Sequence, residues 1–181
     1  MQRDFTYLVA VIERLFMKTA DLNPDQIITL NDYPLYSDDV LSGYLDKCKT
    51  GEALALVPVI SKDIVSEYLS AGLSQVFAEF EEHNPAAGYF MLDGSHRTTA
   101  LTLACRSIAV VIYETDMDIR EARGLVATGQ ILENGTLDLT VEENCEVLSK
   151  YFREKPYFMT VQQKADKLIQ DNYIPPQALM S

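Results

Sequence analysis

The sequence has few cysteines, few basic residues and no long apolar run. Its three cysteines, Cys48, Cys105 and Cys145, are scattered without a C-x-x-C pair, so neither a zinc site nor a disulfide framework is indicated. No apolar run is long enough to span a bilayer, and the N-terminus lacks the features of a signal peptide. We therefore expect a reduced, cytoplasmic protein without a membrane partner, in which Cys105 packs as a small hydrophobic residue.

Basic residues are scarce relative to acidic ones. The chain has 15 lysines and arginines against 27 aspartates and glutamates, a formal net charge of −12. Binding to duplex DNA needs clustered basic side chains that neutralise phosphates, and no basic stripe is present. The composition therefore predicts no duplex DNA partner. A nucleotide needs only a local positive pocket, so a nucleotide site is compatible with this charge.

Histidine is also scarce, and one of the two histidines lies in the most informative segment. His83 lies at the end of a predicted helix and is expected to be solvated, whereas His96 belongs to the segment Asp-Gly-Ser-His-Arg-Thr-Thr-Ala over 93–100. The apolar run 89–92 predicts a short buried strand, and Asp93-Gly94 predicts a sharp turn with a positive φ at the glycine. A helix then begins at Ser95. The first turn of a helix presents backbone N–H groups and a positive dipole end, which favours anion binding.

Each residue of this turn also has a simpler interpretation. Gly94 would serve only the turn, and Ser95 would be an N-cap. Arg97 would form a salt bridge with a neighbour, and His96 would be a half-buried polar residue. Positive charge on Arg97, and on His96 when it is protonated, is nevertheless unfavourable beside the positive end of the helix dipole unless an anion binds there. The combination therefore favours a phosphate site.

Hydrophobic periodicity predicts an α+β fold: a small mixed β-sheet with packed helices, an N-terminal helix and a helical C-terminal extension. Strands are expected over 26–30, 54–60, 89–92 and 108–113. Pro58 lacks an N–H group, which predicts an edge strand or a strand end. If the last two strands are parallel neighbours, the helix between them makes a right-handed crossover.

Helices are expected over 3–19, 38–47, 61–83 (with Gly72 as a break), 95–105, 116–127, 140–153 and 160–171. Asp116 or Asp118 would cap one of them. Two pairs, Thr140 with Glu143 and Thr160 with Gln163, have the spacing of a capping box. The chain would divide into an N-terminal helix (1–24), a core (25–116) and a helical extension (117–181).

The motif segment resembles a known family. The residues from Gly94 to Ala100 fit the G-x-x-R-x-x-A motif of the ParB/sulfiredoxin superfamily. The longer segment from Leu92 to Arg97 resembles the DG-x-HR version found in many ParB-like proteins and in the archaeal free-serine kinase. The resemblance extends over 26–113. It implies a ParB/sulfiredoxin-like core whose motif begins a helix that cradles the phosphates of a nucleotide, namely ATP, ADP or CTP.

The departures from that family narrow the expected activity. Sulfiredoxin has its catalytic cysteine where this chain has Ser95, and a serine hydroxyl offers no thiolate chemistry. Chromosome-partition ParB proteins have arginine where this chain has His96 and add a helix-turn-helix domain, which is not evident here. We therefore expect neither of those two activities.

Phosphoryl transfer depends mainly on positioning and charge neutralisation. The residues expected to bind the nucleotide are Gly94, Ser95, His96, Arg97, Thr98 and Thr99. His96 would bind a phosphate or donate a proton to a leaving oxygen, and Asp93 would hold Mg²⁺ or orient Arg97. A phosphotransferase also needs a base that takes the proton from the hydroxyl group of its substrate. The sequence does not favour any one of the four candidates, which are Asp32, Glu114, Asp116 and Asp118.

Three classes of function remain compatible with the sequence. The first is a nucleotide-dependent phosphotransferase or phosphohydrolase that acts on a small molecule, with a hydroxyl compound as the acceptor. The second is a non-catalytic nucleotide-binding switch whose ligand orders a partner interface. The third, a ParB-like nuclease, is least favoured because the chain is acidic. A homodimer is an open alternative.

Overall fold

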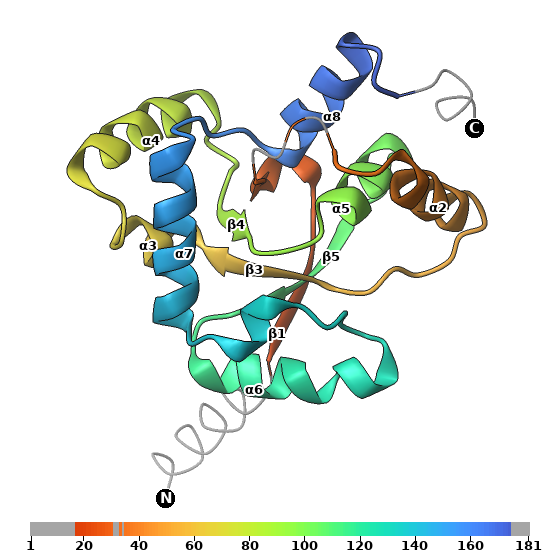
Figure 1. Ribbon diagram of the computed structural model, residues 1–181, viewed down its shortest axis with the longest axis horizontal. Helices are drawn as coiled ribbons and strands as arrows, with labels where there is room; N and C mark the ends of the chain where they lie inside the picture. The colour runs from red at the N-terminus through yellow and green to blue at the C-terminus, as the bar shows by residue number, and fades with distance from the viewer. Residues whose placement is uncertain (1–16, 31–32, 34, 175–181) are drawn as a thin grey trace, which may run out of the picture.

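The computed structural model describes residues 17–30, 33 and 35–174 of the chain. These residues adopt an α+β fold, as predicted, with a five-stranded sheet in the order β1-β5-β3-β4-β2 (Figure 1). The strands are β1 (Lys18–Leu22), β2 (Ile27–Ile28), β3 (Val57–Ser61), β4 (Tyr89–Met91) and β5 (Ile108–Ile112). No helix within the described ranges combines the length and apolarity needed to cross a membrane.

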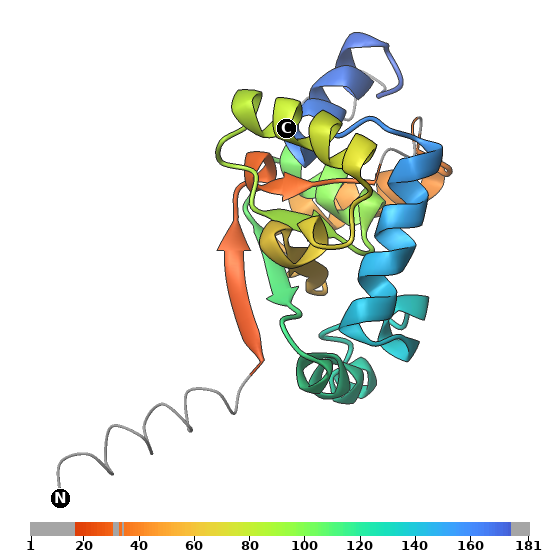
Figure 2. The ribbon, with the colours of Figure 1, turned by 90° about the vertical axis from the view of Figure 1, so that its left-hand side faces the viewer.

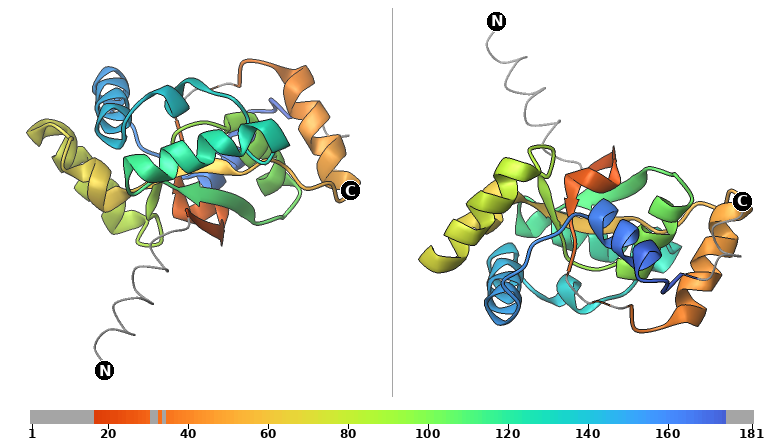
Figure 3. Two further views of the ribbon diagram at one scale, coloured as in Figure 1. Left: turned by 90° about the horizontal axis from the view of Figure 1, so that it is seen from below. Right: turned by 90° about the horizontal axis from the view of Figure 1, so that it is seen from above.

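The helices cover both faces of the sheet, because successive strand residues point to opposite sides. They are α2 (Asp38–Lys49), α3 (Lys62–Ser66), α4 (Ala71–His83), α5 (Ser95–Leu103), α6 (Asp116–Gly124), α7 (Val141–Glu154) and α8 (Val161–Gln170). In β3, Val57 and Val59 pack with apolar residues of α2, α5 and α8. Ile60 points the other way and packs with residues of α3, α4, α6 and α7. Seen from above, α2 and α8 lie toward one side and α4 and α7 toward the other (Figure 3).

The central strand is β3, which pairs parallel with β5 and antiparallel with β4. The strands β4 and β5 are therefore not neighbours, and α5 does not connect parallel adjacent strands. The sheet is mixed, since β2 pairs parallel with β4 and β1 pairs antiparallel with β5. Sequence periodicity predicted all three of these strands, but not that β3 lies between β4 and β5.

Pro58 explains why the chain leaves the sheet just before the motif. It lies near the start of the central strand, so the edge position is wrong and the strand-end position is closer to the structure. Its carbonyl accepts a hydrogen bond of 3.0 Å from the N–H of Leu92, on the β4 side. Proline cannot donate the reciprocal bond, so the β3–β4 ladder ends there. The next residues, Asp93 and Gly94, turn into α5.

The first strand was not predicted. Residues 18–19 belong to β1, where a helix was expected, and residues 3–16 of that helix lie outside the described residues. β1 lies at the outer edge of the sheet beside β5, with Lys18 opposite Ile112 and Leu22 opposite Ile108 (Figure 2). Its sequence, Lys-Thr-Ala-Asp-Leu, has little apolar alternation. Pairing with β5 therefore decides its conformation rather than intrinsic propensity.

Several helix boundaries follow from local capping. Both predicted capping boxes are present: the Thr140 hydroxyl accepts from Glu143 N at 3.1 Å, and the Thr160 hydroxyl accepts from Gln163 N at 3.2 Å. At α6 the N-cap is Thr115, with Asp118 as its capping-box partner, rather than an aspartate alone. The helix expected over 61–83 is two helices, α3 and α4, separated at 67–70.

The three cysteines are free thiols, and two of them are buried. Cys105 is exposed and has a φ of 53°, so its predicted packing as a core residue is wrong. The reason is that α5 ends at Leu103, before the apolar face reaches Cys105. Burial raises the pKa of Cys145 to about 11 and also raises the pKa of Cys48.

Candidate functional site

The turn between β4 and α5 requires glycine at residue 94. Gly94 has a φ of 113°, as the Asp-Gly pair predicted, and it is the N-cap of α5. A Cβ atom at this position would lie 3.2 Å from Arg97 Nη2 and 3.4 Å from Val57 Cγ2. Ser95 is therefore the first residue of the helix and not its cap. Because glycine has no side chain, the N-cap residue supplies no side-chain oxygen to accept a hydrogen bond from the first N–H groups of α5.

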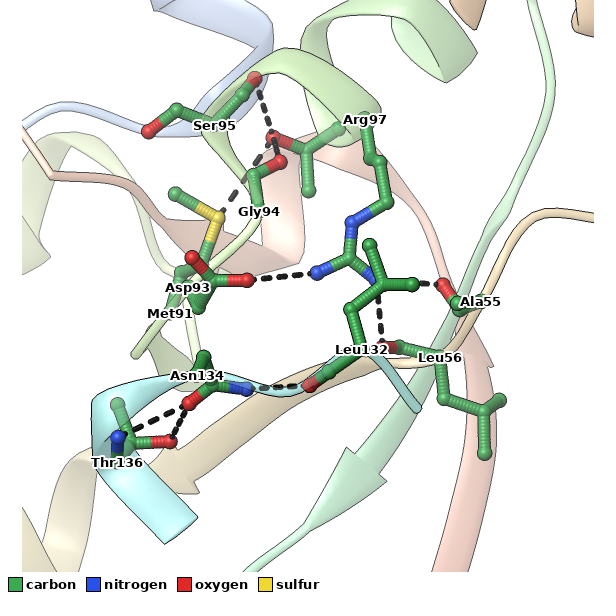
Figure 4. Close-up of polar contacts among 11 residues, drawn as sticks. Ala55, Leu56, Met91, Asp93, Gly94, Ser95, Arg97, Leu132, Asn134 and Thr136 are labelled. Carbon is green, nitrogen blue, oxygen red and sulfur yellow. Dashed lines mark hydrogen bonds and ion pairs between the residues drawn. The ribbon is translucent and has the colours of Figure 1, made fainter. Parts of the chain in front are cut away.

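Arg97 holds this turn against the segment that precedes β3. Its side chain is only 2% exposed. Nη1 donates to the carbonyls of Ala55 and Leu56, each at 2.9 Å, and Nη2 donates to Asp93 Oδ2 at 2.7 Å (Figure 4). These bonds direct the guanidinium to protein groups. The salt-bridge interpretation of Arg97 is thus confirmed, and its expected role as a direct phosphate ligand is not supported by its hydrogen bonds.

The two threonines that follow are fully buried. The Thr98 hydroxyl is 3.1 Å from both Gly94 O and Ser95 O and 3.6 Å from Met91 Sδ, so it bonds back onto its own helix. Thr99 Oγ1 has no hydrogen-bond partner within the part of the chain that the structure describes. Neither side chain lines a cavity at the turn. The phosphate-binding role of these two hydroxyls stays a prediction.

A cavity of about 420 Å³ opens at the start of α5, and we call it the motif cavity. One wall is the turn itself, from Asp93 to Arg97, and the opposite walls come from α2, its preceding residues and the loop before the 3₁₀ turn at 135–138. The residues that line it are Leu30, Tyr36, Val40, Tyr44, Asp93, Gly94, Ser95, His96, Arg97, Leu132 and Glu133. Four of the six predicted nucleotide-binding residues, together with Asp93, thus share one cavity. Tyr36, Tyr44 and Glu133 were not predicted, since only the tertiary fold brings them to the motif.

A second cavity of about 370 Å³ adjoins the first, and we call it the second cavity. Leu30 and Asp93 line both. Most of the rest of its wall comes from 134–136 and from α7, including Asn144, Leu148 and Tyr151. These residues lie in the predicted C-terminal extension, so the site extends beyond the segment that carries the motif.

The carboxylates that were candidates for the catalytic base form ion pairs or hydrogen bonds with other parts of the protein. Glu114 forms an ion pair of 2.8 Å with Lys18, and Asp116 Oδ1 accepts from Val141 N at 2.9 Å. Asp118 accepts from the backbone N–H groups of Glu114 and Thr115. None of the three lines either cavity, and Asp32 lies outside the described residues. The carboxylates that do line the motif cavity are Asp93 and Glu133.

Helix α8 positions the segment that contributes Leu30 to both cavities. Lys164 is fully buried, and its Nζ donates to Leu30 O at 3.3 Å. Tyr33 donates to Asp171 Oδ2 at 2.6 Å, and Thr29 N donates to Met159 O at 3.0 Å. Lys164 lies three residues after Val161, on the apolar face of α8, and a lysine at such a position was the signal in the sequence.

His83 and Tyr113 are two polar residues that line neither cavity. His83 is exposed at the end of α4, with Nδ1 2.8 Å from Glu79 O, as expected of a residue outside the site. Tyr113 is fully buried, and burial together with the carboxylates of Asp93 and Asp118 raises its pKa. Its phenol therefore stays protonated at neutral pH.

Comparison of the chain with protein-family models, with curated proteins and with solved structures finds no match.

Proposed function

We propose that this is a nucleotide-binding protein that holds the phosphates of ATP, ADP or CTP at the start of α5 and transfers a phosphoryl group to a small hydroxyl compound. The observation that carries the proposal is the motif cavity, which the start of a nine-residue helix and His96 both line. The first N–H groups of an α-helix point out of its N-terminus, and in α5 these groups belong to Ser95, His96 and Arg97. Together with the helix dipole, they favour an anion there.

The residues around that helix start have separate proposed roles. His96 binds a phosphate or donates a proton to the leaving oxygen, because its ordinary pKa lies near neutrality. Arg97 acts as a positioning residue, since its bonds to Ala55, Leu56 and Asp93 fix the turn. Ser95 and Gly94 contribute backbone, and Gly94 supplies the positive φ that the turn needs.

The nucleoside part is proposed to lie toward α2. Tyr36 and Tyr44 line that side of the motif cavity, and aromatic rings stack on nucleobases. The volume of about 420 Å³ lies within the usual range of small-molecule sites. The resemblance of the motif to ParB-like proteins and the free-serine kinase supports the same assignment.

Mg²⁺ is the cation that this chemistry implies. Magnesium is usually held by one or two carboxylates with phosphate oxygens and water. Among the described residues, no three His, Cys, Asp or Glu side chains are grouped as ligands, but Asp93 and Glu133 share the motif cavity. Asp93 Oδ2 bonds to Arg97, and the other carboxylate oxygen points away from the guanidinium (Figure 4). These two carboxylates would hold the cation, which would neutralise charge on the phosphates.

We also propose that the protein is cytoplasmic. Its three cysteines are free thiols, which fits a reducing compartment.

Calorimetric titration of the protein with ATP, ADP and CTP, with and without Mg²⁺, tests the proposal. We expect binding of at least one nucleotide, and an affinity about 2- to 13-fold lower in His96→Ala, the range expected for loss of one hydrogen bond. His83→Ala is the matched control, because His83 is the other histidine and lies outside both cavities. Absence of binding to all three nucleotides would refute the proposal. Tight binding without turnover would identify the switch instead of the phosphotransferase.

A further inference from the structure

We infer that the second cavity holds the acceptor, and that this acceptor is an uncharged alcohol with an apolar body. The inference rests on the proposed function, because it assigns the substrate class of the same site. The first observation is continuity: Leu30 and Asp93 line both cavities, so a molecule in the second cavity borders the phosphate end of the first. A hydroxyl group at that border would lie beside Asp93.

The wall of the second cavity indicates the chemical class of its ligand. Its apolar part consists of Leu92, Leu139, Val147 and Leu148. Among its lining residues, all within the described part of the chain, none is basic, so the cavity offers no counter-ion to a phosphorylated or carboxylated acceptor. The apolar wall therefore favours an alkyl or similar body, and Asp93 favours a hydrogen-bond donor such as a hydroxyl group.

Asn144 supplies a second acceptor atom at the polar end. It is 1% exposed, and its Nδ2 donates to Thr136 O at 3.0 Å and to Thr140 O at 2.9 Å, which fixes the orientation of the amide. Its buried Oδ1 accepts no hydrogen bond from the residues that the structure describes. A buried acceptor without a donor is costly, and a donor in this cavity would relieve that cost.

Transfer of the phosphoryl group to this alcohol needs no reagent other than the nucleotide and the alcohol. The acceptor oxygen forms a bond to the terminal phosphorus of the nucleotide, and the bond from that phosphorus to the bridging oxygen breaks. The shortened nucleotide leaves with the bridging oxygen, and the hydroxyl proton is released to water at the mouth of the cavity. Asp93 orients the hydroxyl group, and His96 stabilises the leaving phosphate.

The test uses straight-chain primary alcohols from ethanol to 1-hexanol and follows their binding by amide chemical shifts of the full chain. We expect the shifts of Gly135 and Thr136 to respond, with an affinity that rises about fourfold for each added methylene group that is buried. Because this readout needs no nucleotide, it is separate from the calorimetric test of nucleotide binding. With ATP and Mg²⁺ present, phosphorus NMR should detect the phosphate monoester of 1-hexanol.

Gly135→Leu is the variant that narrows the second cavity. Gly135 lines it, and a Cβ atom there would meet no atom within 4 Å, so the first side-chain atom causes no clash. We expect at least tenfold weaker binding of 1-hexanol and unchanged affinity for ATP. Gly72→Leu is the matched control, because Gly72 also has open space within 4 Å and lies on α4, away from both cavities.

Two results would overturn the inference while leaving the proposed function intact. One is an affinity for 1-hexanol that is unchanged in Gly135→Leu or does not rise with chain length. The other is a parallel loss of ATP affinity in Gly135→Leu, which would place the nucleoside in the second cavity. Failure of the wild-type protein to bind any nucleotide would instead refute the proposed function, and the acceptor role with it.

Discussion

Replacement of Arg97 by alanine should destabilise the whole fold and not only weaken a ligand contact. The guanidinium is 2% exposed and makes three hydrogen bonds of 2.7 to 2.9 Å, which tie the motif turn to residues 55–56. Breaking a buried ion pair by removing one partner usually costs about 3–5 kcal/mol. The Asp93 side chain is 41% exposed, so water takes over part of its solvation, and we expect the lower end, about 3 kcal/mol.

Urea denaturation followed by circular dichroism measures this free energy of unfolding. For a chain of this size, a loss of about 3 kcal/mol corresponds to a melting temperature roughly 6–12 °C lower. Arg123→Ala is the matched control, because Arg123 also pairs with an aspartate, at 3.3 Å, but its side chain is 57% exposed. It should cost about 1 kcal/mol or less. If the two variants were equally stable, the assignment of Arg97 as the residue that holds the turn would be wrong.

Three further predictions concern the same architecture. Gly94→Ala should cost about 1–3 kcal/mol in unfolding experiments because its φ is 113°, whereas Gly72→Ala, within α4, should be neutral or stabilising; equal effects would contradict the positive-φ argument. Thiol titration of the folded protein at pH 8 should detect Cys105 as the one fast-reacting thiol, since burial raises the pKa values of Cys48 and Cys145 and so lowers their thiolate fractions; three fast thiols before unfolding would refute this burial. Duplex DNA should not bind at submicromolar concentration near 150 mM salt, because the net charge is −12; such binding with a steep salt dependence would revive the nuclease alternative.

The sequence correctly predicted the features that depend on residues close together in the chain. The Asp-Gly pair predicted the turn and the positive φ at Gly94, because few other residues adopt that conformation without strain. The spacing of Thr140 with Glu143, and of Thr160 with Gln163, predicted two helix starts, since each capping box lies within one turn. β-branched and apolar runs likewise placed four of the strands to within a few residues.

Tertiary structure decided what depends on partners distant in the chain. β1 forms because it pairs with the free edge of β5. Pro58 is tolerated in the central strand because the hydrogen-bond ladder between β3 and β4 ends beside it. The salt bridge of Arg97 with a neighbour was predicted, but its two carbonyl acceptors lie 41 and 42 residues away, so those bonds could not be predicted from the motif. The second cavity is formed jointly by Leu92 and Asp93 after β4 and by residues of α7, because a cavity wall requires packing that no local pattern encodes.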